Sequence, residues 1–323
     1  MLYEVAFPAL YIGAKARQLS RRVGARMGIA PADMARVTYH PESYYRVACW
    51  QLRRLDVELM MLLAPFRAAR LSIERFERIK QLPDRTRAAA ELAEGESADV
   101  KYRGKRVHMT FFGPESGPKI LALHGWNGRA SMMRKLVEAL AARGYRVVVP
   151  DLPGHGRSEG NRYSFYDLGQ SMADIFLGTR FCAVIGHSAG GLIAGFAIGR
   201  GLRADCYIPV GAPASLSNLL KSYVEITQMP ARSLSYIERY YIRRYGVSPV
   251  DMGTSLLSRL PVRTLVIHET RDWQVGIGNA HELFQAAQSG ELFVTNGYTH
   301  LSVLNAPEVH EKIADFLERN CDV

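Results

Sequence analysis

A serine between glycines gives the clearest chemical signal in this sequence. Gly186-His187-Ser188-Ala189-Gly190 follows an apolar run and precedes a segment of small residues. This context is typical of a sharp turn between a buried strand and a helix, which lifts the serine oxygen above a sheet. The same turn places that oxygen near a helix N-terminus, where negative charge is stabilised. The sequence therefore predicts that Ser188 is a nucleophile.

A serine hydroxyl is a poor nucleophile unless a base accepts its proton and an acid orients that base. Asp272 comes shortly after the apolar run Leu265–Ile267, and His300 lies in the loop after the last apolar run. The order serine, aspartate, histidine is the one typical of this kind of turn. We therefore predict Ser188, Asp272 and His300 as catalytic residues, with Glu269 as the alternative acid.

Attack on a carbonyl group creates a negatively charged oxygen that needs two backbone N–H donors. We expect one donor to be the amide of Ala189, directly after the serine. The other is expected to be the amide of Trp126 in His124-Gly125-Trp126-Asn127-Gly128. The Trp126 indole is predicted to line the substrate pocket, with a plain core tryptophan as the alternative. His187 is assigned with it to substrate binding, although its side chain is expected to point away from the reacting oxygen.

The remaining histidines are weaker candidates for the base. Three of them stand at the ends of apolar runs and are predicted to be hydrogen-bonded structural residues: His124, His155 and His268. The others fall in expected helices or in a hairpin strand: His40, His108, His281 and His310.

The elements that must position these residues begin near residue 98. Residues 99–112 alternate around Gly104, which predicts a β-hairpin. Short, β-branched runs then follow at helix-length intervals: Ile120–Leu123, Val147–Val149, Ala183–Gly186, Tyr207–Val210, Leu265–Ile267 and Leu292–Val294. This pattern predicts an α/β fold with a mostly parallel sheet covered by helices on both faces.

The interval between Val210 and Leu265 is too long for one crossover helix. Residues 214–258 are rich in apolar residues and tyrosines, and we predict a helical cap insertion over the carboxyl ends of the strands. Ligand sites in such sheets lie at those ends.

Residues 1–95 lack alternating patterns and are predicted to form a helical N-terminal extension to the domain of residues 96–323. Helical spacing is expected over 50–63, 71–79 and 84–92, and Pro65 is expected to bend or end the first of these helices. We expect the extension to pack on the core or to mediate a homodimer. Binding to an anionic membrane surface is the less favoured alternative.

The chain of 323 residues carries a net charge of +10, and more than half of this excess lies in residues 1–95. Because arginines and acids are mixed there, a solvated helical surface is favoured over a nucleic-acid site.

Four widely spaced cysteines predict reduced thiols, with neither a disulfide scaffold nor a zinc site. The N-terminus lacks a secretory signal pattern, so a cytoplasmic location is expected. The apolar stretch 181–199 is predicted to be a strand, a turn and a helix in place of a membrane span.

Taken together, these motifs resemble the α/β-hydrolase superfamily, and within it the bacterial esterase- and lipase-like serine hydrolases. The resemblance rests on HGWNG (124–128), DLPGHGRS (151–158), GHSAGG (186–191), HETRD (268–272) and the His300 loop. It implies a capped sheet, the catalytic triad above, and no cofactor or metal. The 151–158 segment is implied to be structural. Glu269 departs from the pattern, since relatives often have glycine there, and Arg271 directly precedes the acid.

The predicted activity is hydrolysis of a carboxylic ester with a medium-chain or lipid-like acyl group, through an acyl-enzyme. Thioester, amide or carbon–carbon bond cleavage by the same triad stays open. A binding scaffold of the same fold is the alternative from another functional class. The resemblance also implies that dehalogenases and epoxide hydrolases differ at the nucleophile, where they carry aspartate in place of serine.

Overall fold

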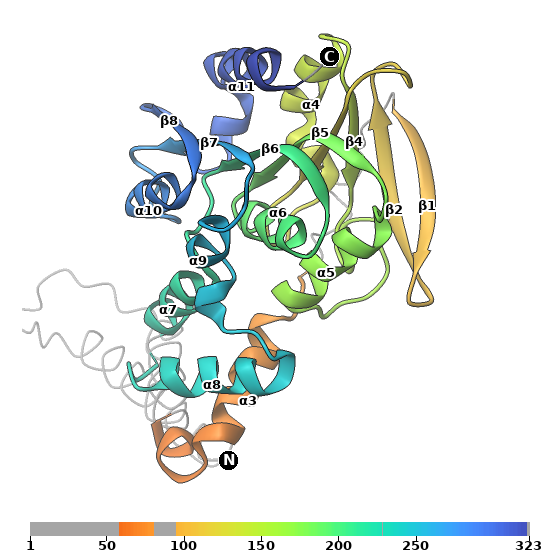
Figure 1. Cartoon of the computed structure of the whole chain (residues 1–323). Coiled ribbons are helices and arrows are strands. Elements are labelled where there is room, and N and C mark those ends of the chain that lie inside the picture. The colour runs from red at the N-terminus through yellow and green to blue at the C-terminus, as the bar shows by residue number, and fades with distance from the viewer. Residues whose placement is uncertain (1–57, 81–94, 228, 322–323) are drawn as a thin grey trace, which may run out of the picture. The chain divides into compact units, whose positions relative to one another are not determined.

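A computed structural model describes residues 58–80, 95–227 and 229–321 (Figure 1). The chain divides into two compact units, one of Met1–Leu71 with Tyr223–Ile237 and one of Ser72–Ser222 with Glu238–Val323. The second unit holds the sheet and every residue predicted to be catalytic.

Within the described residues, eight strands form one sheet in the order β1-β2-β4-β3-β5-β6-β7-β8. The β1–β2 and β2–β4 pairs are antiparallel, and the other pairs are parallel. The strands are β1 (Glu96–Tyr102), β2 (Lys105–Phe112), β3 (Lys119–Leu123), β4 (Arg146–Pro150), β5 (Arg180–His187), β6 (Arg203–Val210), β7 (Arg263–Glu269) and β8 (Ser289–Thr295). The predicted hairpin and mostly parallel sheet are confirmed.

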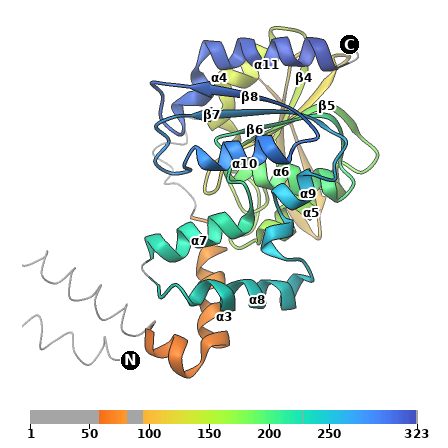
Figure 2. The same cartoon turned by 60° about the vertical axis from the view of Figure 1, so that its left-hand side comes forward.

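Helices cover both faces of this sheet (Figure 2). α4 (Arg134–Ala141) and α11 (Pro307–Asn320) pack on one face, while α5 (Phe165–Ile175), α6 (Ala189–Gly199) and α10 (Gly278–Ala286) lie on the other. Alternate strand residues therefore enter two separate apolar layers. The layer under α4 and α11 includes Ile120, Val147, Val149, Ile185, Ile208 and Ile267. Burial on both faces explains why the strands read as continuous apolar runs.

The strand order brings two loops together at the carboxyl edge of the sheet. β3 lies between β4 and β5, and Leu123 at its end pairs with Gly186 of β5. The chain after β3 and the turn after β5 therefore start side by side, at the kind of position where α/β sheets bind ligands.

The interval between β6 and β7 is helical, as predicted. It contains α7 (Leu216–Ile226), α8 (Ser233–Tyr245), a 3-10 turn (Pro249–Asp251) and α9 (Thr254–Leu257).

The N-terminal extension is only partly described. Helix is present over residues 58–63, breaks at Ala64, and resumes as α3 (Pro65–Phe76), so Pro65 interrupts the helix as expected. The rest of the helix expected over 50–63 and the whole helix expected over 84–92 lie outside the described residues. The division of the chain at residue 95 stays a prediction.

The expectation of four reduced thiols is wrong for one pair. Cys182 in β5 and Cys321 after α11 form a disulfide, while Cys206 is a buried free thiol. The pair forms because α11 packs along the sheet and ends beside β5, a contact that sequence spacing does not reveal. The cytoplasmic location, which rested partly on reduced thiols, stays a prediction.

The apolar stretch 181–199 is the strand β5, a turn and the helix α6, as predicted. Among the helices that the structure describes, none has both the length and the apolar character needed to cross a bilayer.

Candidate active site

Ser188 occupies the predicted turn between β5 and α6. Its backbone has φ 53° and ψ −125°, a conformation that side-chain-bearing residues adopt rarely and that is typical of functional sites. The flanking glycines permit it, because a Cβ at Gly186 would lie 2.4 Å from the Gly190 oxygen. A Cβ at Gly190 would lie 2.3 Å from the Leu123 oxygen.

Backbone hydrogen bonds hold this turn in place. The Ser188 N–H donates to the Val210 oxygen at 2.8 Å, and the Gly191 N–H donates to the Ser188 oxygen at 2.9 Å. Ala189 is the first residue of α6 and is buried. N–H groups in a first helical turn have no acceptor within the helix, so this position suits the oxyanion-donor role of the Ala189 amide, which stays a prediction.

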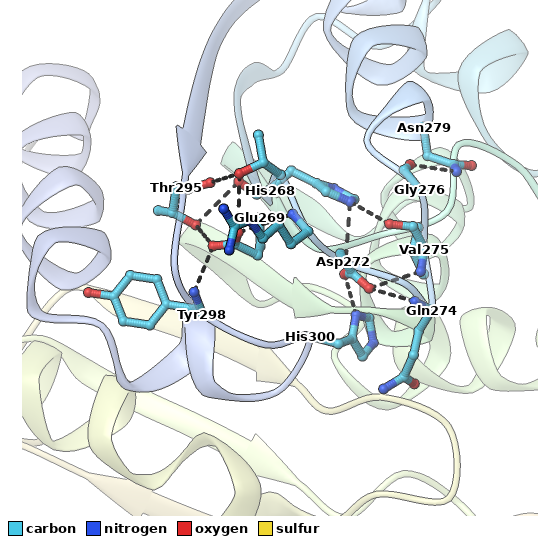
Figure 3. A network of polar contacts seen from close by, with 12 residues as sticks. His268, Glu269, Asp272, Gln274, Val275, Gly276, Asn279, Thr295, Tyr298 and His300 are labelled. Atoms are coloured by element: carbon cyan, nitrogen blue, oxygen red, sulfur yellow. Dashed lines mark hydrogen bonds and ion pairs between the residues drawn. The ribbon is translucent and has the colours of Figure 1, made fainter.

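Asp272 and His300 meet at the carboxyl edge of the sheet (Figure 3). The His300 Nδ1 and the Asp272 Oδ2 lie 2.5 Å apart, and both residues are buried. The other carboxylate oxygen, Oδ1, accepts hydrogen bonds from the amides of Gln274 at 2.9 Å and Val275 at 3.0 Å.

The surroundings favour the charged form of this carboxylate. Burial by itself would raise the pKa of Asp272, but the hydrogen bonds from His300 and from the two loop amides hold that pKa below its usual value. An ionised Asp272 makes the His300 Nδ1 a donor. The His300 Nε2 is then left with a lone pair that can accept a proton.

Glu269, the alternative acid, has different partners. It is fully buried at the end of β7, and its oxygens accept from the amides of Arg271 at 3.1 Å, Gly297 at 3.2 Å and Tyr298 at 3.1 Å. The Thr295 hydroxyl donates at 2.9 Å (Figure 3). Burial would raise the pKa of Glu269, but these hydrogen bonds lower it. Glu269 therefore ties β7 to the loop that carries His300.

Two neighbouring histidines support the same loops. The His187 Nε2 donates to the backbone oxygen of His300 at 2.8 Å, and the His268 Nε2 donates to the Val275 oxygen at 2.8 Å. Burial lowers the pKa of His187 to about 4 and also lowers that of His268, so both rings are neutral donors. The structure thus gives His187 a supporting contact with His300, and its assignment to substrate binding stays a prediction.

The loop after β3 reaches the nucleophile. A Cβ at Gly125 would lie 3.2 Å from the Cβ of Ser188, so the backbone passes directly beside the serine. The His124 Nδ1 donates to the Gly125 oxygen at 2.8 Å, and its Nε2 accepts from the Leu152 amide at 3.1 Å. Burial lowers the pKa of His124 to about 4, which keeps the ring neutral and able to make both bonds. His124 is a structural residue, as predicted.

The Trp126 indole belongs to an aromatic cluster and is half-buried. It stacks on Phe165 with ring centres 4.9 Å apart and on Phe76 at 6.2 Å. The His155 ring meets it edge-on at 5.3 Å. The pocket-lining role predicted for the indole stays a prediction, while its packing role is evident.

The segment 151–158 contacts the loop after β3 through Asp151. Sequence reasoning did not assign Asp151 this role. The Asp151 carboxylate accepts from the amides of Ala130 at 2.7 Å and Arg157 at 2.9 Å. The Ser158 hydroxyl donates to the Asp151 backbone oxygen at 2.5 Å and accepts from the His108 amide at 2.9 Å. These contacts agree with the structural role implied for this segment.

Comparison with known proteins identifies similar chains. The model of a family described as "Alpha/beta hydrolase family" matches residues 120–312. The magnesium-chelatase 30 kDa subunit of Rhodobacter capsulatus is 36% identical over 153 residues, which are 45% of this chain and 52% of that protein. A haloalkane dehalogenase of Psychrobacter cryohalolentis is 38% identical over 82 residues, 25% of this chain and 26% of the relative. The pimeloyl-[acyl-carrier protein] methyl ester esterase of Aeromonas salmonicida is 37% identical over 81 residues, 24% and 31% of the two chains. The chain thus spans about half or less of the length of these relatives.

Solved structures share the fold at lower identity. A thioesterase domain from the curacin biosynthetic pathway superimposes with a TM-score of 0.53 at 15% identity, covering 70% of this chain and 100% of that one. The esterase RhEst1 from Rhodococcus sp. ECU1013 gives 0.52 at 16% identity, covering 69% and 98%. At these identities the likeness concerns the fold alone.

Proposed function

Because the chain belongs to the alpha/beta hydrolase family, we propose that it is a serine hydrolase that cleaves a carboxylic ester through an acyl-enzyme. The observation that carries this proposal is the buried contact between the His300 Nδ1 and the Asp272 Oδ2, 2.5 Å long, at the edge of the sheet where Ser188 holds its strained turn. A base oriented by an ionised acid is what a serine nucleophile requires.

In the proposed reaction, the Ser188 Oγ attacks the carbonyl carbon while the His300 Nε2 accepts the hydroxyl proton. Asp272 stabilises the resulting imidazolium ion. The amides of Ala189 and Trp126 bind the negatively charged oxygen, and each such donor contributes about 3–4 kcal/mol in comparable enzymes. His300 then protonates the departing alcohol, which leaves the acyl group on Ser188.

The second half-reaction uses the same residues. Water attacks the acyl carbon while the His300 Nε2 accepts one of its protons. The tetrahedral intermediate collapses, the carboxylic acid leaves, and the Ser188 oxygen recovers its proton from His300. Apart from the ester and one water molecule, this proposed sequence uses only groups of the chain.

The residue type at position 188 supports ester chemistry over the other activities among the relatives. The family resemblance implies that dehalogenases and epoxide hydrolases of this fold carry aspartate at the nucleophile position, whereas this chain has serine. One of the relatives is named a methyl ester esterase. The leucines of α7 and the tyrosines of α8, between β6 and β7, support a medium-chain or lipid-like acyl group.

The proposal is tested by hydrolysis of p-nitrophenyl esters from acetate to palmitate, with the wild type beside Ser188→Ala. We expect an optimum at medium or long chain length that disappears in the variant. Labelling of the wild type by a fluorophosphonate, followed by intact mass, should add one adduct that Ser188→Ala lacks. Ester hydrolysis that survives in the variant would refute the proposed nucleophile.

Two further outcomes point to the alternatives. Labelling at Ser188 without ester hydrolysis would direct the search to thioesters and amides, which the same triad can cleave. Folded wild type that is neither labelled nor active would favour a non-catalytic binding role. The search for a binding partner would then start from the magnesium-chelatase subunit, which matches the largest share of this chain among the relatives above.

A further inference from the structure

A short segment that precedes the sheet lies against the loop beside the nucleophile. We call Phe76–Lys80 the brace. It lies outside residues 120–312, which the family model matches, but it belongs to the compact unit that holds the sheet.

The brace is fixed by backbone pairing with the loop that follows β4. The Ile79 amide donates to the Asn161 oxygen at 2.9 Å, and the Tyr163 amide donates to the Glu77 oxygen at 3.2 Å. The side chains of Glu77 and Ile79 are buried, each 5% exposed. The brace is therefore fixed in the core and can fix the position of residues that it contacts.

One end of the brace holds Asn127, the residue after the proposed oxyanion donor. Asn127 has φ 55°, in the left-handed region, which costs a residue with a side chain of the order of 1 kcal/mol or more. Its Oδ1 accepts a hydrogen bond from the Lys80 backbone amide at 2.7 Å. This bond ties the strained residue to a fixed point outside the loop.

The other end of the brace holds Trp126 itself. The Phe76 ring stacks on the Trp126 indole at 6.2 Å, with the ring planes 11° apart, and also on Phe165 at 5.7 Å. The two ends of the brace thus contact two consecutive residues of the loop after β3, one through an aromatic ring and one through a backbone amide.

We propose that the brace positions the Trp126 N–H as an oxyanion donor, so that Phe76, the Lys80 amide and Asn127 are positioning residues of the active site. The inference rests on the proposed function, since it assigns a purpose to the loop in that reaction. A donor acts only when it lies about 2.7–3.1 Å from the developing oxyanion. A displacement of about 1 Å in a catalytic group can cost about 100-fold in rate.

The first test uses the backbone bond and a control at the same position. Lys80→Pro removes the N–H donor, whereas Lys80→Ala keeps it and changes only an exposed side chain. Asn127→Gly keeps the positive φ and removes the acceptor. We expect kcat to fall about 10-fold or more in Lys80→Pro and Asn127→Gly, with KM within about 3-fold of the wild type. Lys80→Ala should match the wild type.

The second test uses the aromatic contact. Phe76→Leu removes the stacking on Trp126. Phe176→Leu is the control: it removes an edge-to-face pair with Phe181 at the C-terminal end of α5, whereas Phe165, which contacts Trp126, lies at the N-terminal end. Both should lower stability, but only Phe76→Leu should lower kcat. Equal kcat in the two variants would show that the aromatic contact serves stability alone.

Hydrogen exchange separates this inference from the proposed function. Amides of residues 124–130 should exchange faster in Lys80→Pro and Phe76→Leu than in Lys80→Ala, while β5 and β6 stay protected. If the wild type hydrolyses esters and the brace variants change neither kcat nor exchange, the brace is overturned and the function stands. If the wild type is inert, the proposed function fails, and unchanged exchange would overturn the brace independently.

Discussion

Replacing Asp272 by asparagine tests the assignment of the acid with the smallest change in shape. The asparagine Oδ1 can still accept from the amides of Gln274 and Val275, which lie 2.9 and 3.0 Å from the present carboxylate oxygen. Its NH2 group then occupies the position of Oδ2, 2.5 Å from the His300 Nδ1. Two donors cannot face each other there. His300 must adopt the tautomer with the proton on Nε2, and that nitrogen can no longer accept a proton from Ser188.

The expected effect is large because it removes the base without removing the histidine. The equivalent change in a serine protease triad lowers kcat by about 10⁴-fold, which corresponds to about 5.4 kcal/mol of transition-state stabilisation. The free energy of unfolding should fall by a smaller amount, about 1.5–3 kcal/mol, for the loss of one charged hydrogen bond. The pKa of Asp272 is lowered in the folded protein, so this contribution is present at neutral pH and is lost as the pH falls through that pKa.

The assay is kcat for the best p-nitrophenyl ester, measured for Asp272→Asn beside Glu269→Gln. Glu269→Gln is the matched control. The wild-type Glu269 carboxylate accepts from loop amides, and its replacement leaves the Asp272–His300 contact intact. We expect Asp272→Asn to lose about 10⁴-fold in kcat with its fold retained. An Asp272→Asn enzyme within 10-fold of the wild type, beside a folded but inactive Glu269→Gln, would refute the reasoning and make Glu269 the acid.

Three further predictions concern stability. Glu269→Gln should lower the free energy of unfolding at pH 7 by about 2–4 kcal/mol because buried amides lose a charged acceptor, and the wild type should lose the same advantage as the pH falls through the lowered pKa of Glu269; urea titrations that give equal stability would contradict this. Burial raises the pKa of Glu77 from 4.5 to about 7, so wild-type stability should fall by roughly 3 kcal/mol as the pH rises from 4.5 to 7, and Tm against pH should show no such fall for Glu77→Gln. The disulfide spans 139 residues, so dithiothreitol should lower the wild-type free energy of unfolding by about 4–5 kcal/mol and leave Cys321→Ser unchanged, whereas a wild type indifferent to the reductant would show that the bond does not form in solution.

Much of the fold could be predicted because burial on both faces leaves a direct mark on sequence. Runs such as Val147–Val149 and Leu265–Ile267 are apolar throughout because their alternate side chains enter two different helical layers. The turn at Ser188 could be predicted for a related reason, since Gly186 and Gly190 are required by close backbone approach on either side of it.

The parts that sequence reasoning missed depend on contacts between distant segments. An acid after a strand looks the same whether it contacts a histidine ring or loop amides. The amides of Gly297 and Tyr298 donate to Glu269, a difference from Asp272 that the sequence did not reveal, and the choice of Asp272 as the acid stays a prediction. The bond between the Lys80 amide and Asn127 joins residues 47 positions apart and involves a backbone donor that every non-proline residue has.

The disulfide described above has a topological consequence for the candidate site. It closes a covalent ring that runs from Cys182 to Cys321, and Ser188, Asp272 and His300 all lie inside this ring. Trp126 lies outside it. A protease cut at any peptide bond between the two cysteines therefore leaves both fragments joined until a reductant is added. A cut in the loop 124–130 instead leaves two fragments with no covalent link, which separate on a denaturing gel without reductant. Denaturing gels run with and without reductant therefore report whether the first cut falls inside the ring.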